Sequence, residues 1–204
     1  MSDLERTSAT LPPTGKSTRL KFITLSVTAL LFVILGSMAA QAQTIPLVVT
    51  ATDAGRFYGD PNPAFTGTIT GLRSGDTITV VFNTVANPGS AVGSYQIVPT
   101  LVDPDNQLGA YAVTINNGTL TVTPAPLLVM ADDVARAAGS PNPTFTGTVS
   151  GLKNGDVITA THDSAATADS PAGSYAIVPT LQDQSGNLGN YSVSVANGTL
   201  TVKP

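Results

Sequence analysis

The sequence predicts an all-β protein of two tandem modules, each a small immunoglobulin-like β-sandwich, with a β-grasp-like sheet carrying one short helix as the alternative. Residues 46–124 and 126–204 align without a gap at an offset of 80 residues, and a fixed period is typical of tandem modules. Within each unit, apolar and polar residues alternate with a period of two, which indicates half-buried strands. Every acidic residue after residue 42 is aspartate, which favours turns over helices.

The first 42 residues have the pattern of a secretory signal peptide. Four basic residues precede an apolar run over residues 22–35, and Ala40-Gln41-Ala42 has the spacing of a cleavage site. We therefore expect cleavage between Ala42 and Gln43 and a secreted or cell-surface location. In the alternative interpretation, residues 22–40 form an uncleaved membrane anchor, because their length approaches the ~20 residues that cross a bilayer.

Within the first unit, the alternation predicts six short strands. Their inward-facing residues are, in order, Leu47, Val49 and Ala51; Phe65, Gly67 and Ile69; Ile78, Val80 and Phe82; Tyr95 and Ile97; Tyr111, Val113 and Ile115; and Leu120 and Val122. The intervening threonines are expected to face solvent. Tyr95 opens a strand that runs towards Asp103, as does strand F of immunoglobulin-like sandwiches, where a tyrosine packs at a corner. At most a helical turn is expected, over residues 72–76.

The end of each unit predicts a β-hairpin. Asn117-Gly118 lies between two alternating segments, and Asn197-Gly198 repeats the arrangement. A two-residue Asn-Gly loop favours a type I′ turn, because both central residues need a positive φ. We therefore expect the flanking segments to pair with each other. In the alternative interpretation, Asn117 is a glycosylation acceptor.

The whole linker between the two units is Thr123-Pro124-Ala125-Pro126. Alternating prolines favour an extended and stiff backbone. The modules are therefore expected to lie end to end with little freedom to bend.

The charge balance argues against nucleic acid as a partner. Beyond the leader the chain has five basic and eleven acidic residues, a net charge of −6, whereas binding of phosphates needs basic patches. Cysteine is absent, so no disulfide stabilises modules that are expected to face an oxidising compartment.

Few residues are candidates for chemistry. His162, the only histidine, occupies the position of Phe82 in the first unit, which indicates a structural role, and we predict no catalytic residue and no cofactor. Asp103 and Asp105 lie on one loop with oxygen ligands that suit calcium, but such sequences also form turns without metal. Asp132 and its neighbour Asp133 form a second acidic pair, without the spacing of a ligand set.

The motifs that both units share resemble the MBG/YDG-type repeat of bacterial surface proteins and adhesins. The resemblance rests on Tyr58-Gly59-Asp60-Pro61-Asn62-Pro63, Phe65-Thr66-Gly67, Gly93-Ser94-Tyr95 and Asn117-Gly118-Thr119-Leu120-Thr121-Val122. It implies a cell-surface or secreted repeat module, commonly a stalk or adhesion element without catalytic residues. The second unit departs from the pattern where Ala137-Ala138-Gly139-Ser140 replaces Phe57-Tyr58-Gly59-Asp60.

Together these observations predict a non-enzymatic, exported surface stalk or adhesion segment whose partner is an unknown protein or glycan at the cell surface. The first alternative is a ligand- or glycan-binding module that uses its variable loops, since the units differ most over residues 80–91 and 160–171. The second is a secreted enzyme. Contact with a membrane is expected only through residues 22–40, if the leader is not cleaved.

Overall fold

A computed structural model describes residues 44–204, which form one compact unit. The predicted leader, its cleavage site and the possible anchor at residues 22–40 lie outside the described residues. We call residues 44–124 module 1 and residues 125–204 module 2. The described part of the chain contains no helix with the length and hydrophobicity that a membrane crossing requires.

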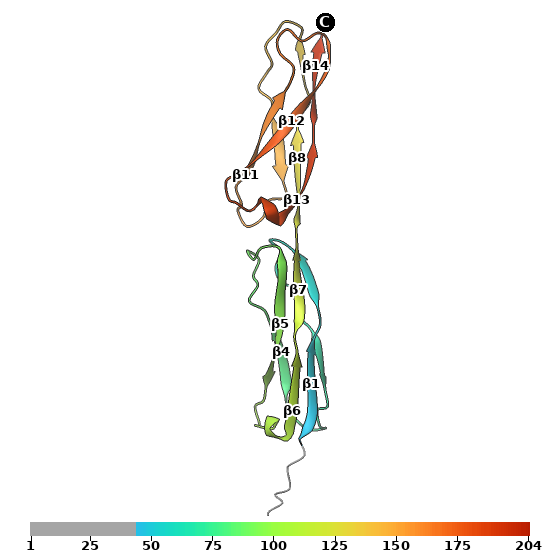
Figure 1. Ribbon diagram of the computed structural model, residues 1–204, viewed down its shortest axis with the longest axis vertical. Helices are drawn as coiled ribbons and strands as arrows, with labels where there is room; N and C mark the ends of the chain where they lie inside the picture. The colour runs from blue at the N-terminus through green and yellow to red at the C-terminus, as the bar shows by residue number, and fades with distance from the viewer. Residues whose placement is uncertain (1–43) are drawn as a thin grey trace, which may run out of the picture. The chain divides into compact units, whose positions relative to one another are not determined.

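Module 1 consists of two sheets (Figure 1). The three-stranded sheet has the order β3-β1-β6, and the four-stranded sheet has the order β2-β7-β5-β4. The elements are β1 (Ile45–Ala51), β2 (Ala54–Phe57), β3 (Gly67–Thr70), β4 (Thr79–Asn83), β5 (Gly93–Val102), the 3-10 helix η1 (Leu108–Ala110), β6 (Tyr111–Asn116) and β7 (Gly118–Thr123).

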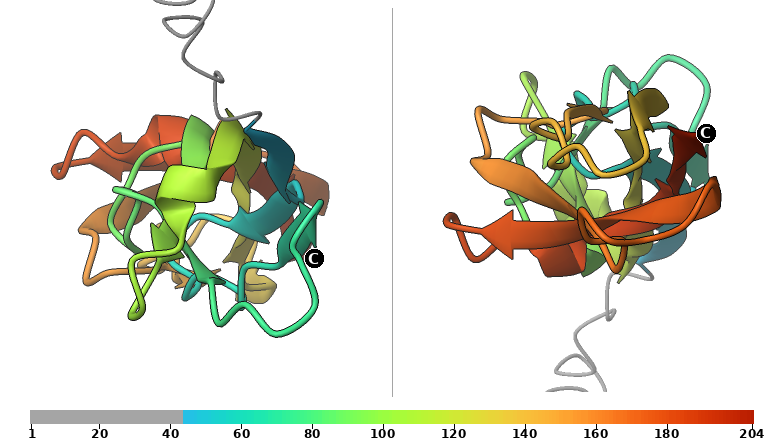
Figure 2. Two further views of the ribbon diagram at one scale, coloured as in Figure 1. Left: turned by 90° about the horizontal axis from the view of Figure 1, so that it is seen from below. Right: turned by 90° about the horizontal axis from the view of Figure 1, so that it is seen from above.

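Module 2 repeats this architecture, with sheets β10-β8-β13 and β11-β12-β14-β9. Viewed end on, strands lie on both sides of the interior (Figure 2). The elements are β8 (Ala125–Ala131), β9 (Val134–Ala137), β10 (Gly147–Ser150), β11 (Ile158–Ser164), β12 (Gly173–Asp183), the 3-10 helix η2 (Leu188–Asn190), β13 (Tyr191–Ala196) and β14 (Gly198–Lys203).

The predicted all-β class and the two-sheet modules are confirmed. The only helices among residues 44–204 are the two 3-10 turns, so the β-grasp alternative is wrong. The helical turn allowed over residues 72–76 is also absent from this region, where the chain forms a bend and a turn. Tyr95 behaves as a corner tyrosine, since its hydroxyl donates a hydrogen bond to the carbonyl of Ala91, four residues upstream, at 2.8 Å.

The predicted Asn117-Gly118 hairpin is wrong. β6 pairs in parallel with β1 in one sheet, while β7 pairs with β5 and β2 in the other. The chain therefore passes from one sheet to the other at Asn117 instead of turning back. Neither Asn117 nor Gly118 has a positive φ among the described residues. The two residues therefore do not adopt the type I′ turn for which an Asn-Gly pair is favoured.

Close packing at this crossing explains the glycine instead. β1 and β2 also change sheets, at residues 52–53, so two parallel segments cross side by side. A Cβ atom at Gly118 would lie 2.9 Å from the carbonyl oxygen of Thr52. The neighbouring Asp53 carboxylate accepts the Thr119 backbone N–H at 2.7 Å, and Asp133 repeats this bond with Thr199. Asp53 and Asp133, which are equivalent, therefore stabilise the point where the chain passes between the sheets in each module.

A buried arginine fixes one end of each module. Arg56 is only 8% exposed and donates hydrogen bonds to the Asn62 side chain (2.8 Å) and to the carbonyls of Phe57 (3.1 Å) and Asn87 (2.5 Å). Asn62 in turn donates to the carbonyl of Ala86 at 2.7 Å. The same bonds recur around Arg136 in module 2. The repeated Pro-Asn-Pro triplet therefore holds an arginine that ties a loop to β2 or β9.

The core follows the predicted alternation in most strands. The prediction is wrong for β6, where Val113 and Ile115 were expected to face inward but are 40% and 47% exposed, on a strand that lies at the edge of its sheet. Fully buried side chains come from both sheets of each module; they are Leu47, Val49, Ile97, Leu120 and Val122 in module 1 and Leu127, Val129, Ile177, Leu200 and Val202 in module 2. Sequence reasoning missed β2 and β9, which are only four residues long and carry the buried arginines.

Candidate inter-module interface

The candidate calcium ligands, Asp103 and Asp105, form loop hydrogen bonds. The Asp103 carboxylate accepts the backbone N–H groups of Gln107 (2.9 Å) and Leu108 (2.8 Å), and these bonds hold the pKa of Asp103 below its usual value. The Asp105 carboxylate accepts the Thr77 hydroxyl at 2.6 Å. In module 2 the backbone N–H of Leu188 lowers the pKa of Asp183 in the same way. The aspartate that both modules share at this position therefore closes the loop before the 3-10 turn.

The two aspartates of the second acidic pair each bond a different partner. Asp132 accepts the Thr146 hydroxyl at 2.7 Å, whereas Asp133 bonds the backbone of Thr199. Within residues 44–204 no three His, Asp or Glu side chains gather in a group that could hold a metal ion.

His162 is partly buried in module 2. It is on β11, and its ring packs on Gly147 as the Phe82 ring packs on Gly67 in module 1, because a Cβ atom at either glycine would collide with the ring. The Nε2 atom of His162 is buried and has no hydrogen-bond partner. The His162 ring thus occupies an aromatic position, but its unpaired Nε2 atom lowers the stability of the folded state.

Replacing His162 by phenylalanine is therefore expected to stabilise module 2 by about 1–2 kcal/mol, since an unpaired buried polar atom costs about that much. Urea unfolding of residues 44–204 would measure the change. The reverse substitution at the equivalent site, Phe82→His, is the matched control and should destabilise module 1. Equal stability of His162→Phe and the wild type would show that the nitrogen is hydrated or bonded.

A shallow groove lies between the variable segment of module 1 and strand β5. It has a volume of about 490 Å³ and is lined by Asn83, Thr84, Val85, Ser94, Tyr95, Gln96 and Val98. Val85 is 88% exposed. Asn83, Thr84 and Val85 belong to residues 80–91, where a binding protein was expected to hold its ligand contacts, whereas the other four lining residues lie on β5.

The most extensive polar arrangement lies where the two modules meet. Pro124 is the only residue between β7 and β8, so the linker is shorter than the predicted four residues. Ala125 is fully buried and pairs with Tyr191 on β13. Strands begin and end directly on either side of this single proline, an arrangement that favours the predicted stiffness.

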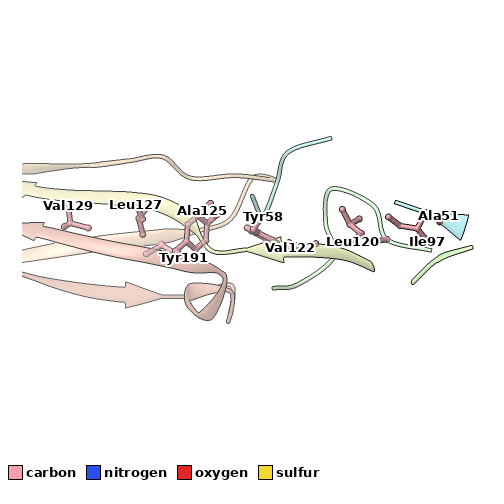
Figure 3. Packing of buried hydrophobic residues seen from close by; sticks show 11 residues of the cluster. Ala51, Tyr58, Ile97, Leu120, Val122, Ala125, Leu127, Val129 and Tyr191 are labelled. Atoms are coloured by element: carbon pink, nitrogen blue, oxygen red, sulfur yellow. The ribbon is translucent and has the colours of Figure 1, made fainter. Parts of the chain in front are cut away.

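The hydrophobic core continues across this junction. One buried cluster contains Ile97, Leu120 and Val122 of module 1 together with Leu127, Val129 and Ile158 of module 2 (Figure 3). Tyr58 and Tyr191 join the two halves. Burial of apolar surface shared between the modules favours their association.

Tyr58 is the centre of the junction. It is 2% exposed, and its ring meets the Tyr191 ring edge to face, with centroids 5.5 Å apart at an angle of 80°. Both hydroxyls donate to the Asp156 carboxylate, from Tyr58 at 3.1 Å and from Tyr191 at 2.6 Å. Asn187 donates to the other carboxylate oxygen at 2.6 Å. The partly buried Asp156 carboxylate therefore has hydrogen-bond partners from both modules.

Next to Tyr58, Gly59 and Asp60 contact Lys153. Gly59 has a φ of 82°, and any Cβ atom there would collide with the Lys153 side chain. The Lys153 Nζ atom lies 2.9 Å from Asp60, with both side chains about one third exposed. A half-exposed pair of this kind contributes about 0–1 kcal/mol. Glycine is thus required both for the backbone conformation and for the close approach of module 2.

Two further hydrogen bonds cross the junction. The Asn154 side chain donates to the carbonyl of Pro88 at 3.2 Å, and the Val92 N–H donates to the Asn190 side chain at 3.0 Å. These bonds extend the contact between the modules beyond Tyr58 to the loop of module 1 that contains Pro88 and Val92.

Raising the pH should weaken the junction through Tyr191. Burial, and then the hydrogen bond to Asp156, raise the pKa of Tyr191 to about 12, against about 10 in an unfolded chain. The folded state keeps a proton that the unfolded state loses, so the stabilisation is complete below about pH 10 and is lost as the pH rises towards about 12. Urea titrations across this window should show a smaller loss for Tyr191→Phe than for the wild type. If the stability of Tyr191→Phe and of the wild type fell equally with pH, the pH dependence would not arise from Tyr191.

The repeated two-sheet modules and their buried junction define a tandem-repeat, all-β protein. The family model described as MBG domain (YGX type) matches the chain twice, over residues 47–121 and 127–201. The chain therefore belongs to this family, which confirms the resemblance. A search of curated proteins found no match. The Tyr-Gly pair of the family description corresponds to Tyr58-Gly59, the residues that contact module 2.

Sequence reasoning did not identify the junction as a site. A difference between the two copies nevertheless pointed to it. The second unit departs from the first at residues 137–140, and the equivalent residues of module 1, 57–60, form the junction. In module 1 this segment meets another module, and in module 2 no described residue covers it.

Proposed function

We propose that the protein is a non-enzymatic, exported tandem-repeat segment that acts as a stalk or adhesion element at the cell surface. The observation that carries the proposal is the junction around Tyr58, where a continuous hydrophobic core and polar bonds join two modules that share a single proline as linker. Such a junction transmits orientation from one module to the next, which is what a stalk requires. Membership of a family of surface-associated repeat modules supports the same function.

Export and surface exposure can be tested on intact cells that produce the full chain. Fractionation with N-terminal sequencing should find a protein that begins at Gln43, accessible to protease added outside the cells. An intact chain confined to the cytoplasm would contradict the proposal. Retention in the membrane with residues 22–40 present would favour the anchor and leave the surface role in place.

The groove in module 1 favours a second candidate, a ligand- or glycan-binding module. Ala165 and Ala176 replace the groove residues Val85 and Gln96 in module 2, whereas Tyr95 and Val98 recur there as Tyr175 and Val178. Glycan and protein arrays probed with residues 44–204, beside a Tyr95→Ala, Val98→Asp double variant, separate the two functions. Binding that the variant loses would favour a binder, whereas the stalk proposal expects no specific ligand at the groove.

A further inference from the structure

The two terminal segments of each module lie side by side and run in the same direction. In module 1 these segments are residues 45–57, which contain β1 and β2, and residues 111–123, which contain β6 and β7. β1 pairs in parallel with β6 in one sheet, and β2 pairs in parallel with β7 in the other. The chain enters the module through the first segment and leaves it through the second, so this parallel ladder connects the two ends of the module.

The register of the ladder does not change where the segments pass from one sheet to the other. In both sheets the paired residues are 66 positions apart, as Thr50 and Asn116 are. At the crossing the Asp53 carboxylate accepts the backbone N–H of Thr119 at 2.7 Å, again across 66 positions. This bond therefore joins the segments in the stretch between their two paired regions.

Module 2 repeats the ladder. Residues 125–137 pair in parallel with residues 191–203 in the same two sheets, and the bond between Asp133 and Thr199 also spans 66 positions. Only Pro124 separates β7 from β8, and Figure 1 shows one strand leading into the other. The ladders of the two modules are therefore connected in series along the chain.

Tension between the ends of the chain loads each ladder in shear. In module 1 it pulls β1 towards its N-terminus and, through β7, pulls β6 towards its C-terminus. Because β1 and β6 are parallel, the two forces act along the strands in opposite directions and strain the evenly spaced bonds of the ladder together. Bonds that share a load in this way yield at a higher force than bonds that open one after another.

The hydrophobic core opposes the same sliding motion. Leu47 and Val49 of the first segment and Leu120 and Val122 of the second are fully buried. Successive side chains of a strand point to opposite faces, so a slip of one residue would move a whole set of side chains from the core to solvent. Sliding of the segments therefore breaks the ladder and exposes the core in the same step.

We propose that each module bears tensile load through its parallel terminal segments, which form a shear clamp, and that Asp53 and Asp133 hold the clamp together where it changes sheets. The inference rests on the proposed stalk function, because a surface stalk experiences tension along its chain. The clamp is directional. It resists tension between the module ends, whereas it opens pair by pair when the starts of β1 and β6 are pulled apart sideways.

Single-molecule force spectroscopy of residues 43–204, the chain expected after cleavage of the leader, tests the proposal. Because the sequence has no cysteine, introduced cysteines attach DNA handles at chosen points. Thr44→Cys with Pro204→Cys loads both clamps in shear. Thr44→Cys with Gly109→Cys instead pulls apart the starts of β1 and β6 in module 1. A Cβ atom at Gly109 meets no other atom within 4 Å among the described residues, so this position tolerates a side chain.

The lowest unfolding force with handles at positions 44 and 204 should be at least about twofold that with handles at positions 44 and 109, because the residue pairs share the load only in shear. Both chains have the same fold, so the difference between them reports the direction of loading. Equal forces in the two geometries would overturn the proposal, and this comparison requires no variant of the core or of the ladder.

Matched double variants test the two aspartates. Asp53→Ala with Asp133→Ala removes the bond at each crossing and should lower the unfolding force in shear, while the force with handles at positions 44 and 109 stays unchanged, because that geometry opens the ladder from its far end. Asp103→Ala with Asp183→Ala removes hydrogen bonds to backbone N–H groups in loops outside the ladder and should leave the force in shear unchanged. An equal loss of force in both double variants would overturn the role of the aspartates.

Failure of the clamp and failure of the stalk are distinguishable. A surface-exposed protein whose unfolding force is equal in the two geometries would contradict the clamp alone. A chain that is stronger in shear but confined to the cytoplasm would contradict the stalk alone.

Discussion

Replacing Arg56 by alanine is expected to lower the free energy of unfolding of module 1 by about 3 kcal/mol or more, because hydrogen bonds to a charged group contribute about 1.5–3 kcal/mol each and stranded buried acceptors add a penalty. The guanidinium is 8% exposed and bonds one side chain and two backbone carbonyls. Its loss releases the loop around Asn87 from β2. Urea unfolding of residues 44–204, monitored by far-ultraviolet circular dichroism and by amide exchange, measures the loss of stability.

Two controls make this prediction specific. Arg136→Ala should have an effect of similar size on module 2, since its bonds repeat those of Arg56. Arg56→Lys keeps the charge but cannot reproduce the forked geometry, so it should recover less than half of the loss. A stability change below about 1 kcal/mol, the range of exposed substitutions, would show that the arginine does not hold the loop.

Replacing Tyr58 by alanine is expected to uncouple the two modules. The change removes a buried ring, the edge-to-face contact with Tyr191 and one hydrogen bond to Asp156. Removal of a buried aromatic side chain costs about 3–5 kcal/mol in a core, and we expect about 3 kcal/mol at this junction. Calorimetry should show one coupled transition in the wild type and two resolved transitions in the variant.

The matched control separates the ring from its hydroxyl. Tyr58→Phe keeps the packing on Tyr191 and loses a single hydrogen bond, worth about 1 kcal/mol, so its unfolding should remain coupled. Two independent transitions in the wild type, or identical behaviour of Tyr58→Ala and Tyr58→Phe, would contradict a role for the ring in coupling.

Much of the fold follows from the sequence because local patterns report local burial. The alternation over Leu47, Val49 and Ala51 identified β1 and its inward face, and Tyr95 identified the start of the long strand β5. The failure at Asn117-Gly118 has a physical cause. The pair is compatible with either a hairpin or a close crossing, and only long-range pairing with β1 and β5 decides between them.

The junction could be predicted only in part. The short proline linker indicated stiff coupling, but the contacts across the junction join residues at least 66 positions apart, such as Asn154 with Pro88 and Tyr58 with Asp156. No periodicity in the sequence reports such a pair. Comparison of the two copies did contain part of the information, because Tyr58 and Asp60, which contact module 2, are replaced by Ala138 and Ser140 in the second copy.

The central claim is that the buried junction around Tyr58 makes the two modules one rigid body. Residual dipolar couplings of backbone amides in weakly aligned residues 44–204 test it most directly. A single alignment tensor should fit the couplings of both modules in the wild type, and Tyr58→Ala should require two tensors of different magnitude. Two independent tensors in the wild type would contradict the claim, because they would show modules that reorient about Pro124 despite the contacts between them.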